Sequence, residues 1–206
     1  LPYTDCSPGF GSVAKYVATS TLEAGLDVKS MAETSTKVFI LEVMGRHAGW
    51  IAASSCLAAS KAGDPPHIIL LPEVPFEKSK FITQVKQTVK NNGYCVIVAS
   101  EGTQTKNGKF LSDSGLTDAF GHKQLGGVAP VLANMISKIG FKNHWAVADY
   151  LQRSARHIAS KTDLDQAYAV GVHAVKLAVA GKTAVMPIIK RISDSPYKWK
   201  IATAPL

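Results

Sequence analysis

Short runs of apolar and β-branched residues alternate with segments of helical pattern, and this alternation constrains the fold of the chain most. Continuously apolar runs of this length are typical of parallel strands that are covered on both faces. The runs lie at 37–43, 67–71, 94–99 and 145–148, and the helical segments at 12–24, 48–62, 78–91, 128–139 and 164–180. The pattern therefore predicts an α/β fold with a doubly wound, mostly parallel sheet.

Glycines indicate where the predicted helices end. A glycine follows each helical segment, at the position where a left-handed cap is common; these are Gly25, Gly63, Gly93, Gly140 and Gly181. Near the end of the chain, 186–192 and 197–201 read as two strands joined by a Ser-Asp-Ser-Pro turn.

The stretch 100–127 interrupts the alternation, because it is rich in Gly, Ser, Thr, Asp and Lys and shows almost no periodic pattern. A loop of this length in a compact domain is usually a lid or a binding loop, or else a mobile segment. We expect the boundary of any second lobe to fall in it.

Charge and cysteine usage limit the classes of partner. Lys and Arg number 23 against 15 Asp and Glu, so the net charge is +8. The lysines are scattered, which favours small phosphorylated ligands over nucleic acid.

No apolar run reaches the length of about 18 residues that a membrane span requires. The widely spaced Cys6, Cys56 and Cys95 indicate a reducing, cytoplasmic location, with Cys56 in an apolar helix of the core and no metal-ligand spacing of Cys or His.

Charged side chains follow three of the predicted strands at their carboxyl ends, where α/β sheets bind ligands. Arg46 lies in a Met-Gly-Arg turn, Glu101 in Ser-Glu-Gly, and Arg153 shortly after the strand at 145–148. Arginine binds phosphate through a fork of donors, and a carboxylate accepts hydrogen bonds from sugar hydroxyls. Together these residues favour a phosphorylated sugar as ligand.

Motifs in consistent order over nearly the whole chain resemble the phosphofructokinase family, and its pyrophosphate-dependent branch most. They are the opening Thr4–Ser12, Met44-Gly45-Arg46 with Gly49, Pro72-Glu73, Ser100-Glu101-Gly102, Leu125-Gly126-Gly127, Tyr150–Ser154, and the run from Ser160 through Gly171 to Ala174-Val175. The resemblance implies a phosphotransferase that moves a phosphoryl group from pyrophosphate to the 1-hydroxyl of fructose 6-phosphate in glycolysis. Asp149 and Ser154-Ala155 replace glycines of many ATP-dependent members.

The resemblance also assigns residues to the site. It implies that fructose 6-phosphate is bound by Met44, Gly45, Arg46, Glu101, Tyr150 and Arg153. Arg46 would in addition stabilise charge on the transferred phosphoryl group. Lys37 and His144 correspond to positions that reach the sugar phosphate of a neighbouring subunit, so the resemblance implies a homo-oligomer.

The family's general base, its donor-phosphate loop and its Mg²⁺ ligands would all precede Leu1. We therefore expect a chain that is incomplete at its N-terminus. Residues 1–206 would form the C-terminal, acceptor-binding portion, with no general base or metal ligand of its own and no activity alone. An ATP-dependent 6-phosphofructokinase and a non-catalytic sugar-phosphate-binding subunit of the same fold remain the alternatives.

Overall fold

The computed structural model describes residues 3–117, 123–125 and 127–206, which divide into two compact units. The larger unit is Ala14–Ala155, and the smaller comprises Leu1–Val13 with Arg156–Leu206. The division thus falls at Val13/Ala14 and Ala155/Arg156, whereas the sequence placed a lobe boundary near 100–127. Each unit is described by itself.

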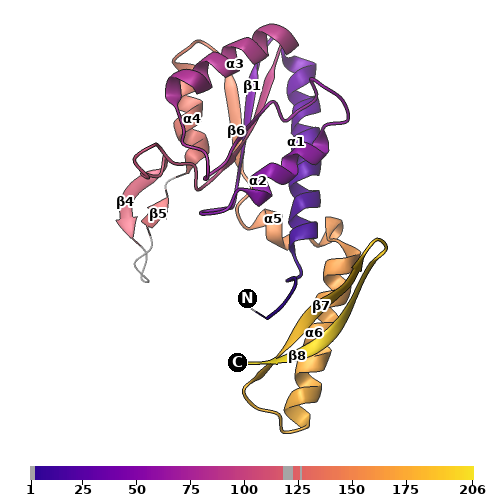
Figure 1. Ribbon diagram of the computed structural model, residues 1–206. Coiled ribbons are helices and arrows are strands. Elements are labelled where there is room, and N and C mark those ends of the chain that lie inside the picture. The colour runs from indigo at the N-terminus through magenta and orange to yellow at the C-terminus, as the bar shows by residue number, and fades with distance from the viewer. Residues whose placement is uncertain (1–2, 118–122, 126) are drawn as a thin grey trace. The chain divides into compact units, whose positions relative to one another are not determined.

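A four-stranded parallel sheet forms the centre of the larger unit (Figure 1). Its strands are β1 (Val38–Val43), β2 (Ile68–Leu70), β3 (Cys95–Ser100) and β6 (Asn143–Val147), in the order β2-β3-β1-β6. Ile40 of β1 lies opposite Ile97 of β3 and Trp145 of β6. The sheet confirms the predicted parallel arrangement, and each apolar run overlaps one strand.

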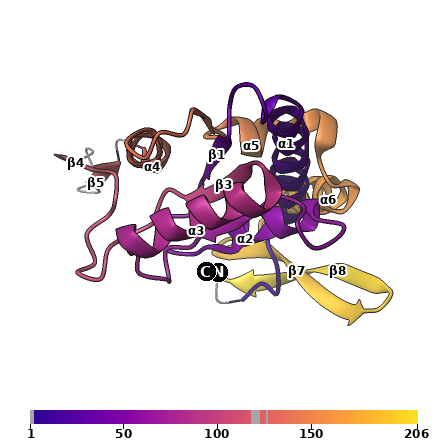
Figure 2. The same cartoon turned by 90° about the horizontal axis from the view of Figure 1, so that it is seen from above.

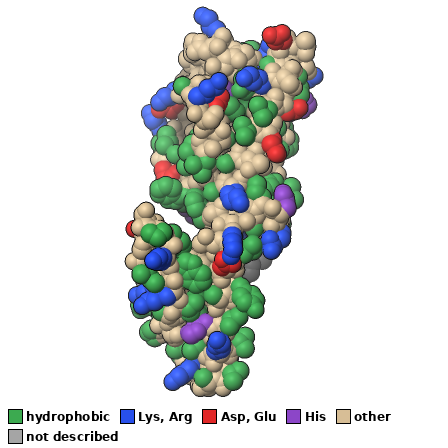
Figure 3. Space-filling view, turned by 90° about the vertical axis from the view of Figure 1, so that its right-hand side faces the viewer, with side chains coloured by type: hydrophobic (Ala, Val, Ile, Leu, Met, Phe, Trp, Pro, Cys, Tyr) green, Lys and Arg blue, Asp and Glu red, His purple; other side chains and the backbone are tan. Residues whose placement is uncertain are grey.

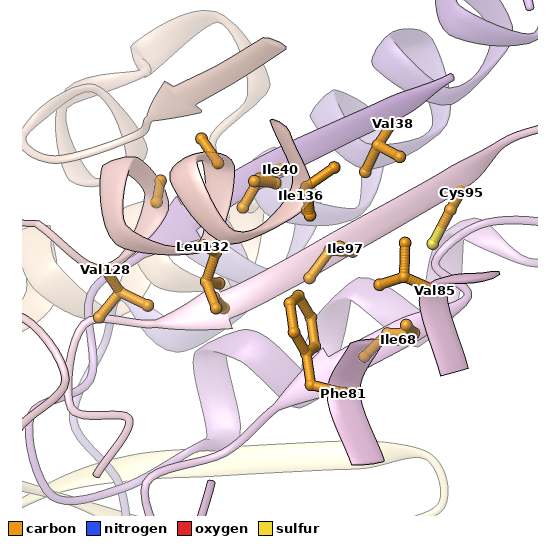
Figure 4. Close-up of a cluster of buried hydrophobic side chains, with 13 residues drawn as sticks. Val38, Ile40, Ile68, Phe81, Val85, Cys95, Ile97, Val128, Leu132 and Ile136 are labelled. Atoms are coloured by element: carbon orange, nitrogen blue, oxygen red, sulfur yellow. The ribbon is translucent and has the colours of Figure 1, made fainter. Parts of the chain in front are cut away.

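Helices cover both faces of this sheet. On one face, Val38, Ile40 and Ile97 pack with side chains of α3 (Lys78–Asn92) and α4 (Val128–Ser137) in the cluster of Figure 4. On the other face, Phe39 and Val96 pack with the C-terminal part of α1 (Phe10–Met31). Figure 2 shows α1 and α4 on opposite sides of β1. Because successive side chains of a strand point to opposite faces, continuously apolar strands satisfy both layers.

Two predicted helices end elsewhere than the sequence indicated. α1 continues past Gly25 to Met31, so this glycine does not end the helix. The segment predicted as a helix over 48–62 forms α2 (Trp50–Ser54) and a 3₁₀ turn (Ser55–Ala58), and Cys56 is exposed rather than in the core. The other four glycines have the predicted left-handed φ, between +68° and +88°.

The stretch 100–127 contains more regular structure than predicted. β4 (Asp113–Thr117) pairs antiparallel with β5 (Lys123–Leu125), with an irregular register between Asp113 and Leu116. Residues 118–122 and 126 lie outside the described residues. The prediction of a nearly structureless loop was therefore wrong for the paired segments.

The smaller unit is a helix on a two-stranded antiparallel sheet. α6 (Lys161–Val179) packs against β7 (Val185–Asp194) and β8 (Tyr197–Pro205), which confirm the two predicted strands and extend them. The Gln166 side chain of α6 donates a hydrogen bond to the Tyr197 hydroxyl at 2.8 Å. A short 3₁₀ turn, Arg156–Ile158, precedes α6.

Basic and acidic side chains are interspersed over the face shown in Figure 3. Lys and Arg do not gather there into one continuous basic patch, which fits the scattered lysines of the sequence. Within the described residues, no helix is long and apolar enough to cross a membrane.

Candidate functional site

The carboxyl edge of the sheet carries six of the predicted site residues. β1, β3 and β6 are adjacent and end at Val43, Ser100 and Val147. In the strand order β2-β3-β1-β6, the connection that leaves β1 leads towards the β2 edge of the sheet. The connection that leaves β3 passes through the β4–β5 pair and leads towards the β6 edge. Connections that leave adjacent strands in opposite directions create the crevice in which α/β sheets bind ligands.

Close backbone packing requires glycine in the turns that follow β1 and β3. Gly45 has φ +140°, and a Cβ atom there would lie 2.6 Å from the Ala48 carbonyl oxygen. A Cβ atom on Gly102 would lie only 2.0 Å from the Arg46 carbonyl oxygen. The backbones of the Arg46 turn and the Glu101 turn are therefore in direct contact, and only glycine, which has no Cβ atom, fits at Gly102.

Side chains from the end of β3 extend this contact. The Gly45 N–H donates to Glu101 Oε1 at 3.3 Å, and the Ser100 hydroxyl donates to the Gly45 carbonyl oxygen at 2.5 Å. The Glu101 N–H donates to the Val43 carbonyl oxygen at 2.9 Å. One Glu101 oxygen is thus directed to the Arg46 turn.

Arg46 is half-buried, and its Nε atom is buried without a hydrogen-bond partner in the described part of the chain. It also forms no ion pair with any residue that the structure describes. A buried guanidinium N–H without a partner is costly, so the side chain is suited to an anionic ligand that accepts this hydrogen bond.

The turn after β6 carries a second arginine. Tyr150 precedes the short helix α5 (Leu151–Ser154), and the Arg153 guanidinium carbon lies 4.4 Å from the centre of the Tyr150 ring. Both side chains are exposed. A cation–π contact of this kind orients the guanidinium while its donors stay free for a ligand.

Glu42 is a functional candidate that the sequence analysis did not identify. It is buried in β1, and its Oε2 accepts the Ala129 N–H at the start of α4 at 2.8 Å. Burial raises the pKa of this carboxyl above its ordinary value of 4.5, the Ala129 hydrogen bond partly offsets the rise, and the nearby Glu101 adds to it. A carboxylate inside an apolar strand pattern was the signal for it.

Glu73 supports the Arg46 turn from the side of β2. Its Oε1 accepts the Gly49 N–H at 2.7 Å, and a Cβ atom on Gly49 would lie 2.7 Å from its other carboxylate oxygen. Glu73 therefore restrains Gly49, which ends the turn and immediately precedes α2. The sequence pointed to the Pro72-Glu73 pair but not to this contact.

Lys37 and His144 lie at the opposite end of the sheet from Arg46 and Arg153. Lys37 precedes the first residue of β1 and donates through Nζ to the Ala32 carbonyl oxygen, whereas His144 is exposed near the start of β6. The structure therefore separates these two residues from the six at the carboxyl edge.

Among the residues that the structure describes, no three His, Cys, Asp or Glu side chains come together as ligands for a metal ion. The arrangement can instead bind an anion through its arginines and hydroxyl groups through Glu101. Fold and geometry together describe an α/β protein whose candidate anion-binding residues lie at the carboxyl edge of a parallel sheet.

Comparisons with known proteins agree with this class. A model of the family "Phosphofructokinase" matches residues 1–178. The pyrophosphate–fructose 6-phosphate 1-phosphotransferases of Halomonas elongata and Methylococcus capsulatus are 66% and 57% identical over the whole of this chain, which in each case covers 49% of their length. A crystal structure titled as a pyrophosphate-dependent phosphofructokinase from Marinobacter aquaeolei matches with a TM-score of 0.81 at 60% identity, over 100% of this chain and 48% of that one.

The chain belongs to the phosphofructokinase family. It spans about half the length of the curated relatives that it matches. The predicted family and fold are confirmed, and the similarity to pyrophosphate-dependent relatives agrees with the branch that the sequence favoured.

Proposed function

We propose that this chain is the acceptor-binding part of an enzyme that transfers a phosphoryl group from pyrophosphate to the 1-hydroxyl of fructose 6-phosphate, giving fructose 1,6-bisphosphate. The observation that carries the proposal is the convergence of Arg46, Glu101 and Arg153 on one edge of the sheet, with the Arg46 Nε–H buried and without a partner among the described residues. A sugar that carries a phosphate and several hydroxyls matches this set of donors and acceptors.

In this proposal each residue has a role that follows from its chemistry. Arg46 and Arg153 bind the phosphate, and Glu101 accepts hydrogen bonds from sugar hydroxyls. Gly45, which follows Met44 in the binding turn, lets the backbone approach the ligand closely, and Tyr150 orients Arg153 through the contact of their side chains. Arg46 also stabilises negative charge on the transferred phosphoryl group.

The proposal assigns neither the general base nor the ligands of Mg²⁺ to these 206 residues. Phosphoryl transfer uses a divalent cation to neutralise charge on the phosphates. In the proposal, this chain contributes binding and orientation of the acceptor, which lowers the entropic barrier to an in-line transfer.

The proposal also includes an assembly of copies in the cytoplasm, in which Lys37 and His144 contact the sugar phosphate of a neighbouring subunit. Their place at the far end of the sheet from Arg46 is compatible with a ligand other than the one at the carboxyl edge. The Lys37 ammonium would have to leave the Ala32 carbonyl oxygen to make that contact.

Two arginine variants test the acceptor site. Arg46→Ala and Arg153→Ala, made in the protein at its natural length, should each raise the KM for fructose 6-phosphate by roughly ten- to hundredfold. A hydrogen bond to a charged group is worth about 1.5–3 kcal/mol, which corresponds to that range. Lys86→Ala, which removes one exposed positive charge from α3, should leave the KM unchanged. Wild-type kinetics in both arginine variants would contradict the proposal.

The phosphoryl donor needs a separate assay of the natural-length protein with pyrophosphate and with ATP. We expect turnover with pyrophosphate, in line with the names of the relatives reported above. Turnover with ATP alone would favour an ATP-dependent 6-phosphofructokinase. Binding of fructose 6-phosphate without turnover of either donor would favour a non-catalytic sugar-phosphate-binding subunit.

A further inference from the structure

Gln152 is a buried amide side chain between two functional side chains that point outward. Its residue is 2% exposed, whereas Tyr150 before it and Arg153 after it are exposed. The single turn of α5 thus directs Gln152 into the protein while its neighbours remain available to a ligand. None of the roles proposed above uses this glutamine.

Both polar atoms of the Gln152 amide are engaged, each in a different turn of the site. Its Oε1 accepts the Met44 N–H at 3.3 Å, and its Nε2 donates to the Asp149 carbonyl oxygen at 2.9 Å. Among the described residues, it is the only side chain that hydrogen-bonds both the turn after β1 and the turn after β6. The partners are an N–H group and a carbonyl oxygen, so they also determine the orientation of the amide.

The backbone pairing of β1 with β6 stops just before these turns. Their register ends at Glu42 and Val147, and the last backbone hydrogen bond runs from the Ala148 N–H to the Glu42 carbonyl oxygen at 2.9 Å. Beyond that point, Gln152 connects the two segments. One of its partners, Asp149, has φ +39°, a conformation that is uncommon for residues other than glycine and is kept where the surroundings hold it.

We propose that Gln152 is a positioning residue that sets the distance between the turn carrying Arg46 and the turn carrying Tyr150 and Arg153, so that one phosphorylated sugar can reach both. This inference rests on the proposed function of the site. Bidentate recognition by arginine depends on accurate placement, and a displacement of about 1 Å can cost roughly a hundredfold in rate. The effect of losing Gln152 should therefore appear in acceptor recognition.

The test replaces the amide by a side chain of similar length in two matched places. Gln152→Met removes both hydrogen bonds at the site, and Gln166→Met removes one in the smaller unit, where Gln166 is also 2% exposed and donates to the Tyr197 hydroxyl. The natural-length protein is assayed with fructose 6-phosphate and pyrophosphate, and its folding is monitored by circular dichroism and thermal unfolding.

Gln152→Met should raise the KM for fructose 6-phosphate at least about tenfold, with the KM for pyrophosphate within about twofold of wild type. Gln166→Met should change neither. If Gln152→Met does not fold, Gln152→Glu serves instead, because it keeps an acceptor for the Met44 N–H and loses the donor to Asp149. The same split between the two KM values is then expected.

The outcomes separate this inference from the function on which it rests. An active wild-type protein whose Gln152 variants keep the wild-type KM for fructose 6-phosphate, or raise both KM values equally, overturns the positioning role alone. A wild-type protein that neither binds fructose 6-phosphate nor turns it over overturns the proposed function, and the inference falls with it.

Discussion

At the scale of single residues, the carboxyl edge contains side chains of two kinds. Tyr150 and Arg153 are exposed, and Arg46 Nε has no hydrogen-bond partner among the described residues, whereas Glu42 and Gln152 are buried and accept hydrogen bonds from backbone N–H groups. The buried polar groups are costly to desolvate and are retained in hydrogen bonds, so they specify the positions of the turns.

Glu42 should make the stability of the larger unit depend on pH. Because the folded-state pKa is raised above 4.5, the folded protein holds this proton to a higher pH than the unfolded chain does. The stability that protonated Glu42 contributes is present below the unfolded pKa and is lost as pH rises through the folded pKa. The side chain of Glu42→Gln does not titrate, so the stability of wild type relative to this variant should fall with rising pH. Urea unfolding from pH 4 upward measures this difference.

Asp64 provides a control of opposite sign. The Ser60 hydroxyl and the N–H groups of Ser60 and Lys61 donate to its carboxylate, and these hydrogen bonds lower its pKa below 3.8. The stability that ionised Asp64 contributes is present above the unfolded pKa and is lost as pH falls through the folded pKa. The stability of wild type relative to Asp64→Asn should therefore rise with pH. A stability difference between wild type and Glu42→Gln that is constant with pH would show that Glu42 is not desolvated as described.

At the scale of elements, two helix-interior glycines differ in their surroundings. In α1, a Cβ atom on Gly25 would lie 2.6 Å from Cγ of Pro65, so the helix and the segment before β2 are in close contact there. In α6, a Cβ atom on Gly171 would meet nothing within 4 Å. Only the first glycine is required by packing.

The same substitution should therefore have opposite effects in the two helices. Gly171→Ala should stabilise its unit by about 0.5–1 kcal/mol, because alanine favours the helix over glycine. Gly25→Ala gains the same helix propensity, but overpacking against Pro65 costs about 1–3 kcal/mol, so this variant should be less stable than wild type. Calorimetric unfolding of both variants measures whether each change stabilises or destabilises the protein. Stabilisation by Gly25→Ala would contradict the close contact with Pro65.

At the scale of the whole molecule, thiol accessibility reports whether the parallel sheet is intact. Cys95 is buried in β3, and burial raises the pKa of its thiol to about 12, whereas Cys56 is exposed and Cys6 is half-buried. Since the thiolate is the reactive species, a thiol reagent at pH 8 should modify Cys56 readily and leave Cys95 unmodified in the folded protein.

Denaturation is the control for this experiment, because all three cysteines should then react. Mass spectrometry of the labelled peptides identifies the modified position. Modification of Cys95 as fast as Cys56 under native conditions would be incompatible with a closed core between β3 and α3.

Local pattern was sufficient for the elements of the sheet and for grouping the residues that we propose as ligand-binding. Continuous apolar runs predict buried parallel strands, and parallel strands bring their carboxyl ends to one edge, so Arg46, Glu101 and Arg153 could be grouped from the sequence. The two strands near the end of the chain were predicted from two runs that flank a Ser-Asp-Ser-Pro turn. The resemblance to the family added Met44, Gly45 and Tyr150, and their roles stay predictions.

Only the tertiary structure decided which residues hold that edge together. The hydrogen bonds of Gln152 to Met44, of Glu42 to Ala129 and of Glu73 to Gly49 join positions that are far apart in the sequence. The close approach of α1 to Pro65 at Gly25 is a contact of the same kind, which no local propensity contains. Periodicity specifies which face of an element is buried, whereas contacts between elements depend on distances that exist only once the chain has folded.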